Sequence, residues 1–251
     1  MTFIKKILHK FSIPFVFFSL GFDIIFAKIK SKKFKKNNSD VFTVDRHKLV
    51  YKIFKKILWI KRIKVVAKGF ENIANKQILF IPDHKSLWDA MVVFVSLYEN
   101  GLATPLTFVC KKELSEKKNI DAVISLLNGI YLDRSSGKSI LACYNRQQLL
   151  AKQGYSICVF PEGTRVPGHE FKEFKPAVLK IAYNSGLSIA PICIYGADLK
   201  KSKGDDYLHN VYVTMFKPMT PSQFLNIKQE QLMATFKEMI VKEYFSLKEK
   251  L

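Results

Sequence analysis

From about residue 63 to residue 249, short apolar runs alternate with longer stretches in which apolar residues recur at helical spacing. The short runs are rich in Ile, Val, Leu and Phe, which is typical of strands that are buried on both faces of a sheet. The predicted strands are Ile63–Ala67, Ile78–Pro82, Leu106–Cys110, Gly129–Leu132, Tyr155–Phe160, Ile189–Ile194 and Val211–Phe216. Helices are predicted between most of them, and the last covers Ile227–Glu249. The alternation predicts a single α/β domain with a central mixed sheet flanked by helices.

The first 60 residues follow a different pattern. Residues 11–27 form an apolar run that contains Pro14 and Asp23 and is slightly shorter than the roughly 20 residues a membrane-spanning helix needs. Residues 46–60 predict an amphipathic helix, with aliphatic and Phe side chains on one face and lysines on the other. We therefore divide the chain into an N-terminal membrane-attachment segment, residues 1–60, and a catalytic domain, residues 61–251. Whether residues 11–27 span the membrane, re-enter it or lie flat stays open.

Charge strengthens this division. The net charge is +20, and residues 1–68 hold 18 lysines and arginines against three aspartates, so this segment alone carries +15. A basic amphipathic helix beside an apolar run is typical of attachment to anionic membrane lipids. A signal peptide is one alternative, but no small-residue cleavage site follows the apolar run. Packing of the amphipathic helix in the protein core is the other alternative, but it does not explain the apolar run at residues 11–27.

Two clusters of polar residues carry the candidate chemistry: residues 84–89, His-Lys-Ser-Leu-Trp-Asp, and residues 160–165, Phe-Pro-Glu-Gly-Thr-Arg. Five positions on one helix rotate by about 140°, so His84 must lie in the turn before the helix predicted at Leu87–Tyr98 if it is to meet Asp89. There it suits general-base catalysis, in which an imidazole removes a proton from a hydroxyl group. Asp89 would hold the other ring nitrogen. The alternative is a capping box, with Ser86 as N-cap and Asp89 bonding backbone N–H groups.

The second cluster breaks a predicted strand at its carboxyl end, where α/β proteins place ligands. Arg165 offers a planar guanidinium that binds phosphate oxygens in pairs, and Gly163 permits close backbone approach. The alternative is a surface turn in which Glu162 and Arg165 form an ion pair.

With two further segments, these clusters resemble the glycerolipid acyltransferase family. Its motifs H-x-x-x-x-D, G-x-x-x-x-R, F-P-E-G-T-R and a proline-containing apolar strand occur here in order, at His84–Asp89, Gly129–Arg134, Phe160–Arg165 and around Pro191. The resemblance covers roughly residues 60–220, and in length and layout it is closest to the 1-acylglycerol-3-phosphate acyltransferases. It implies that His84 and Asp89 are catalytic. The residues it implies for substrate binding are Glu162, Gly163, Thr164, Arg165 and Arg134. Lys112 follows the predicted strand Leu106–Cys110 and would add positive charge around the acceptor headgroup or the phosphates of the donor. The alternative is a solvated lysine at the start of a helix.

The resemblance also implies a reaction. A fatty acyl group would pass from acyl-CoA or acyl carrier protein to the free hydroxyl of lysophosphatidate, giving phosphatidate for phospholipid synthesis, at the cytoplasmic face of the membrane and without a cofactor. Glycerol-3-phosphate or another lysophospholipid is the alternative acceptor. The chain departs from the family's pattern at Asp83, where Asn is usual, and at Val166, where Ser is common. Asp83 either interacts with His84 or points elsewhere.

Other chemistry finds little support. The four cysteines are isolated, with no C-x-x-C spacing, so we expect free thiols and no metal. A basic protein that binds nucleic acid is the remote alternative suggested by the charge, but its lysines are interleaved with aliphatic and Phe runs and form no recognisable nucleic-acid module, so no specific nucleic acid is expected. Residues 166–174 and 198–207 are the loops predicted to move.

Overall fold

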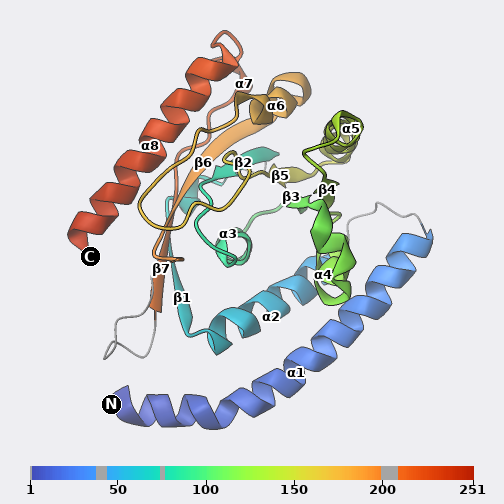
Figure 1. The fold of residues 1–251 in the computed structure, drawn as a ribbon, viewed down its shortest axis with the longest axis vertical. Coiled ribbons are helices and arrows are strands. Elements are labelled where there is room, and N and C mark those ends of the chain that lie inside the picture. The colour runs from blue at the N-terminus through green and yellow to red at the C-terminus, as the bar shows by residue number, and fades with distance from the viewer. Residues whose placement is uncertain (1, 38–43, 74–76, 199–208) are drawn as a thin grey trace.

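The computed structural model describes residues 2–37, 44–73, 77–198 and 209–251, and Figure 1 shows a central sheet with helices on both sides. The seven strands lie in the order β1-β7-β6-β2-β5-β3-β4. They are β1 (Ile63–Lys68), β2 (Ile78–Pro82), β3 (Leu106–Lys111), β4 (Ile130–Leu132), β5 (Ser156–Cys158), β6 (Ser188–Tyr195) and β7 (His209–Met215). Neighbouring strands are parallel except β6 and β7. The predicted α/β domain with a mixed sheet is confirmed.

The central strand β2 explains why the apolar runs are unbroken. Ile78 and Phe80 point into the core on one face of the sheet, whereas Leu79 and Ile81 point into the core on the other face. All four side chains have no exposed surface. A strand covered on both faces needs apolar residues at every position, since successive side chains alternate between the two sides.

Helices cover each face of the sheet. They are α1 (Thr2–Asn37), α2 (Val44–Ile60), α3 (Asp89–Glu99), α4 (Lys118–Leu126), α5 (Gly137–Lys152), α6 (Lys180–Ser185), α7 (Pro221–Phe224) and α8 (Gln229–Lys250), with short 3-10 turns η1 (Phe70–Asn72), η2 (Lys112–Glu116) and η3 (Pro176–Leu179). The core on one face includes α2, α3 and α4, and the core on the other includes η3, α6 and α8. Figure 1 shows α1 as an outer layer beyond α2 and α4.

The apolar run at the N-terminus is part of one long helix, because α1 continues through Pro14. Polar contacts hold it against the domain along its length. The ammonium of Lys56 on α2 binds Asp23, and Lys35 forms a 2.7 Å ion pair with Asp121 on α4. Between them, the guanidinium of Arg46 lies 4.2 Å from the centre of the Phe34 ring.

The face of α1 that is turned away from these contacts is apolar and exposed. Its exposed large side chains are Leu8, Phe11, Phe15, Phe17, Phe18, Phe22, Ile25, Phe26 and Ile29. Residues 8–36 have a length and a mean hydropathy of 1.7 that would allow a membrane crossing, which alone is weak support for one because signal sequences share these properties.

The prediction for α2 needs correction. Its apolar residues Val50, Ile53, Phe54 and Leu58 are buried in the domain core, so this face is not free to enter a membrane. At the start of the helix, Nε2 of His47 accepts the backbone N–H of Leu106 on β3 at 3.0 Å. Burial lowers the pKa of His47 to about 4, so the imidazole is neutral near pH 7. The division at residue 60 therefore assigns to the attachment segment a helix that packs within the domain.

Element ends differ from the sequence predictions by at most two residues, as at β5, which is shorter than predicted. Val159 lies beyond the strand, yet its N–H still donates to the carbonyl of Phe80 on β2 at 3.0 Å. Of the loop predicted to move at residues 198–207, all but Asp198 lies outside the described residues.

Candidate active site

Four of the predicted site segments lie along one edge of the sheet. His84 follows β2, residues 160–165 follow β5, Lys112 follows β3 and Arg134 follows β4. These strands are consecutive neighbours in the sheet and all run parallel. Their carboxyl ends therefore meet at the same edge, which is where open α/β sheets bind ligands.

His84 and Asp89 form the central pair of this edge. Nδ1 of His84 lies 2.8 Å from Oδ2 of Asp89, with His84 in the loop and Asp89 at the first residue of α3. Asp89 is fully buried, whereas 22% of the His84 side chain is exposed. Since Nδ1 faces the carboxylate, Nε2 is the nitrogen that remains, and no hydrogen-bonding partner reaches it among the described residues. The pair has the arrangement of a base and its orienting acid.

The capping contacts predicted as the alternative are present as well. Oδ2 of Asp89 accepts the N–H groups of Lys85 at 2.6 Å and Ser86 at 2.7 Å, and Oδ1 accepts the Ser86 hydroxyl at 2.7 Å. The N-cap itself is Trp88 and not Ser86. The two interpretations of Asp89 are therefore compatible, because one carboxylate braces the loop and binds the imidazole.

Phe160 supports the His84 ring from the second motif. The two rings stack with their centres 4.1 Å apart and an angle of 26° between their planes. This contact limits rotation of the imidazole and also links the loop after β2 to the loop after β5. Sequence reasoning placed Phe160 in a strand and missed this role.

Glu162 joins the same two loops through hydrogen bonds. Oε1 accepts the N–H of His84 at 3.0 Å, and Oε2 accepts the N–H of Lys172 at 3.1 Å. The side chain is only 3% exposed. Burial raises the pKa of Glu162, while these two N–H groups and the charge of Lys85 oppose that rise. Glu162 is placed to brace the site, and its predicted contact with substrate stays a prediction.

Arg165 is exposed and makes no ion pair with Glu162, which contradicts the alternative of a surface pair between them. Gly163 has a φ of 70°, and a Cβ atom on it would lie 3.4 Å from Cζ of Arg134. The guanidinium of Arg134 is thus packed against the Phe-Pro-Glu-Gly-Thr-Arg turn, where Thr164 is also exposed. Arg134 thus lies against the turn that carries Arg165 two residues after Gly163, which makes this the cationic part of the site.

Lys112 lies at the outer end of the same edge. Its ammonium is 3.3 Å from Oδ2 of Asp133, the residue before Arg134, and both groups are largely exposed. An exposed pair of this kind contributes little to stability. The structure places Lys112 near Arg134 and gives it no contact with His84.

Asp83 points away from His84 and towards β6. Its Oδ1 accepts the N–H of Ile194 at 2.7 Å, and the side chain has no exposed surface. Oδ2 has no hydrogen-bonding partner in the described part of the chain. Burial raises the pKa of Asp83 well above its usual range, and the charge of Asp89 acts in the same direction. A protonated carboxyl at this position has the shape and charge of the Asn that is usual in the family.

The segment after Arg165, residues 166–175, is called the strap below. It is irregular in structure and was predicted to move, yet backbone hydrogen bonds tie both ends of it to the site. The N–H of Val166 donates to the carbonyl of His84 at 2.8 Å, and the N–H of Lys175 donates to the carbonyl of Pro161 at 3.1 Å. Val166 itself is buried.

Lys85 is the residue that sequence reasoning left without a role. It is 1% exposed, and its ammonium donates to the carbonyl of Glu170 in the strap. The one signal available was the position of this lysine between His84 and Asp89, in a loop at a sheet edge where a charge is hard to hydrate.

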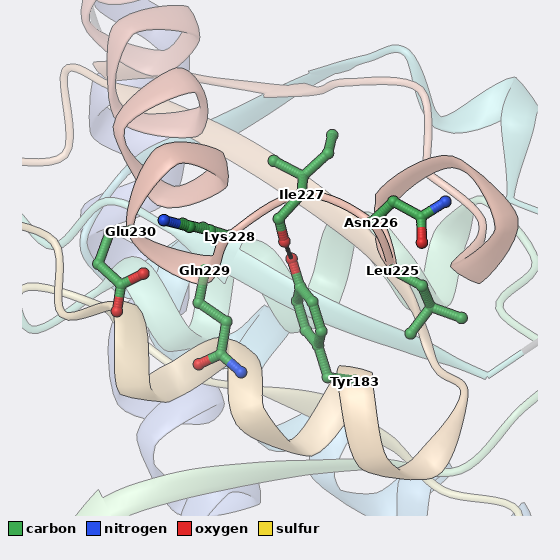
Figure 2. A pocket seen from close by; sticks show the side chains of 7 residues that line it. All are labelled: Tyr183, Leu225, Asn226, Ile227, Lys228, Gln229 and Glu230. Atoms are coloured by element: carbon green, nitrogen blue, oxygen red, sulfur yellow. Dashed lines mark hydrogen bonds between the residues drawn. The ribbon is translucent and has the colours of Figure 1, made fainter.

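Two cavities in the described part of the chain lie away from this edge. One of about 530 Å³ lies between α6 and the segment from α7 to α8, lined by Tyr183 and residues 225–230. Figure 2 shows the Tyr183 hydroxyl bonded to the carbonyl of Ile227 in this cavity, at 2.6 Å. None of its lining residues was predicted to act in the site. In the part of the chain that the structure describes, no group of three or more His, Cys, Asp or Glu side chains is placed to hold a metal ion.

Comparison with known proteins agrees with the geometry. The family model described as "Acyltransferase" matches residues 64–195. A Mycoplasma genitalium protein named "Probable 1-acyl-sn-glycerol-3-phosphate acyltransferase" is 31% identical, over 98% of this chain and 95% of its own length. A Mycoplasma pneumoniae protein with the same name is 32% identical, over 74% of this chain and 73% of its own.

The fold has a counterpart among solved structures. The crystal structure of the 1-acyl-sn-glycerophosphate acyltransferase from Thermotoga maritima superposes with a TM-score of 0.66, covering 99% of this chain and 98% of that chain. The two sequences are 23% identical, so this match supports the fold alone.

The state of Asp83 gives a prediction on stability. A carboxyl whose pKa is raised by folding stabilises the protein fully below about pH 4, and this contribution is lost as the pH rises towards the raised pKa. Asp83→Asn needs no proton, so its melting temperature should exceed that of the wild type by an amount that grows from pH 5 to pH 8. Each pKa unit corresponds to about 1.4 kcal/mol, or about 3–6 °C for a chain of this size.

Asp121→Asn is the control with the opposite sign. Although partial burial raises the pKa of Asp121, the ammonium of Lys35 and the hydroxyl of Tyr131 lower it below its usual value overall. This variant should lose stability at neutral pH. An Asp83→Asn protein that is less stable than the wild type at every pH would mean that Asp83 is ionised.

Proposed function

Because the chain belongs to the acyltransferase family, we propose that it transfers a fatty acyl group to the free hydroxyl of lysophosphatidate and so forms phosphatidate. The donor is a thioester, either acyl-CoA or acyl carrier protein. The names of both Mycoplasma relatives and their identity over most of this chain support this choice of acceptor. The observation that carries the chemistry is the 2.8 Å contact between His84 and Asp89 beside two exposed arginines.

In the proposed mechanism, Nε2 of His84 removes the proton from the acceptor hydroxyl as its oxygen attacks the thioester carbonyl. A carbon–oxygen bond forms, the carbon–sulfur bond then breaks, and the imidazolium returns the proton to the leaving thiolate. Asp89 stabilises the imidazolium and holds the ring so that Nδ1 carries its proton towards the carboxylate. The acyl group passes directly from donor to acceptor, and no acyl-enzyme is required.

Arg165 and Arg134 are proposed to hold the phosphate of the acceptor. A guanidinium binds two phosphate oxygens at once, and two of them beside one glycine turn suit a dianionic headgroup. Both side chains are exposed, so they are available to a ligand. Because Gly163 has no side chain, the guanidinium of Arg134 can pack against the turn.

We propose that α1 attaches the enzyme to the cytoplasmic face of the membrane, where the acyl donors are found. Since Lys56, Arg46 and Asp121 hold one side of α1 against the domain, the helix lies in the membrane interface with its Phe-rich face in the lipid. A helix that crossed the bilayer would lose these contacts. The lysines of the N-terminal region add attraction to anionic lipids.

The mechanism predicts the effect of two substitutions. His84→Ala should lower kcat by about 10² to 10⁴, the usual contribution of a general base. Asp89→Asn should have a similar effect, because an amide oxygen can replace Oδ2 in its hydrogen bonds while the charge that stabilises the imidazolium is lost. The activity of each variant is measured as transfer of labelled acyl groups to lysophosphatidate in vesicles. Its melting temperature shows whether the fold is kept.

Glu99→Gln is the matched control, since it removes the charge of a carboxylate that is paired with Lys55 at the other end of α3 and should leave kcat near that of the wild type. If Asp89 only braces the loop, Asp89→Asn will keep its activity and show a small change in melting temperature, which contradicts the mechanism.

The acceptor site is tested by Arg165→Lys, which keeps the charge and loses the paired hydrogen bonds. The KM for lysophosphatidate should rise by about tenfold or more, while the KM for the donor should stay unchanged. Arg146→Lys on α5 is the matched control. A panel with glycerol-3-phosphate and other lysophospholipids identifies the acceptor, and a rise confined to the donor's KM would place the phosphate elsewhere.

The interfacial helix is tested by replacing Phe15, Phe18 and Phe22 with Ser. These side chains are exposed, so the fold should hold, but each loses about 1.5–3 kcal/mol of burial in lipid. The wild type should float with anionic vesicles in 1 M salt, and the triple variant should be released. Leu225→Ser, at an exposed position after α7, is the control. Protection of an N-terminal epitope inside sealed vesicles would instead show that α1 spans the membrane.

A further inference from the structure

Two residues from segments that are distant in the sequence, Lys85 and Tyr244, contact the middle of the strap. Lys85, from the loop of His84, directs its ammonium to the carbonyl of Glu170 and lies 3.5 Å from the centre of the Phe171 ring. Tyr244, from α8, is fully buried, and its ring centre lies 5.1 Å from the same ammonium. The lysine is therefore enclosed by one carbonyl and two aromatic faces.

Tyr244 binds the strap directly as well. Its hydroxyl donates to the carbonyl of Gly168 at 3.1 Å and lies 3.1 Å from Nδ1 of His169. The N–H of Gly168 donates to Asp198, which follows β6. Both backbone groups of Gly168 are thus bonded to partners outside the strap.

Burying the ammonium of Lys85 is unfavourable unless its contacts compensate for the hydration that it loses. A buried ammonium loses its hydration, and the carbonyl, the aromatic rings and the charge of Glu162 replace it only while the strap is in place. The position of the strap determines in turn where Arg165 and the carbonyl of His84 lie, because Val166 connects to both. The residues around the ammonium are therefore coupled to the catalytic loop.

We infer that Lys85 and Tyr244 are positioning residues that hold the strap as a fixed wall of the active site, so that α8 takes part in acceptor binding. The inference rests on the proposed function. It adds an element that lies outside residues 64–195, the part of the chain that matches the family. It also replaces the prediction that residues 166–174 form a mobile loop.

Tyr244→Phe is the central test, because it removes one hydroxyl and keeps the ring over Lys85. Tyr183→Phe is the matched control, since the Tyr183 hydroxyl also donates to a backbone carbonyl but in the cavity beside α6 shown in Figure 2. In the full-length protein in vesicles, Tyr244→Phe should raise the KM for the acceptor about five- to tenfold, with kcat and the donor KM little changed. Tyr183→Phe should change none of the three.

Hydrogen exchange provides a readout that does not depend on the reaction. Peptides covering residues 166–175 should exchange about five- to tenfold faster in Tyr244→Phe than in the wild type, while peptides from β2 and β6 stay unchanged. Lys85→Met keeps the apolar stem and removes the ammonium, so it should release the strap further and lower kcat/KM about 100-fold. If this variant fails to fold, Tyr244→Phe still decides the question.

Three results would overturn the inference. If the exchange rates and kinetic constants of Tyr244→Phe both match those of Tyr183→Phe, the Tyr244 hydroxyl does not hold the strap. Faster exchange with unchanged KM would show that the strap is tied but does not position the acceptor. A lower kcat with KM values for donor and acceptor that rise equally, together with a lower melting temperature, would show a general structural role. Faster exchange with a raised KM for an acceptor other than lysophosphatidate supports the inference and corrects only the proposed substrate.

Discussion

The site depends on the buried carboxylate of Asp89. A charge with no exposed surface is stable only when its oxygens are fully hydrogen-bonded, and the loop after β2 supplies two N–H groups, one hydroxyl and the imidazole of His84. To deliver them, the loop must fold back on the first turn of α3. The spacing of five residues between His84 and Asp89 follows from this geometry, since a continuous helix would separate their side chains.

Much of this arrangement could be predicted from the sequence because the relevant signals are local. Strands buried on both faces are unbroken apolar runs, and the second polar cluster was correctly predicted to follow the carboxyl end of one of them. The face of α2 was misassigned for a physical reason. A basic amphipathic helix has the same pattern whether Ile53 and Leu58 enter a membrane or a protein core, and only the contacts with α3 and the sheet distinguish the two.

The strap lay beyond sequence reasoning because its contacts join segments that are far apart in the chain. Lys85 and Glu170 are separated by 85 residues, and Gly168 and Tyr244 by 76. An irregular segment rich in polar residues has no periodicity to reveal such contacts. For the same reason the sequence suggested two outcomes for Asp83 without choosing between them, since its partner is the backbone of Ile194 on a strand 111 residues away.

The order of the strands has a consequence for how two substrates can meet. From β2 the chain continues into α3 on one face of the sheet, whereas from the neighbouring β5 it continues through the strap to η3 and α6 on the other face. The loops after these two neighbouring strands meet at His84, because Glu162 accepts its N–H and the Phe160 ring stacks on its imidazole. Connections that leave for opposite faces of the sheet are therefore joined at one residue beyond the carboxyl ends of the strands, where open α/β sheets bind ligands. Of the His84 side chain, 22% is exposed there, so the connectivity of the chain determines from which side substrates can reach the imidazole.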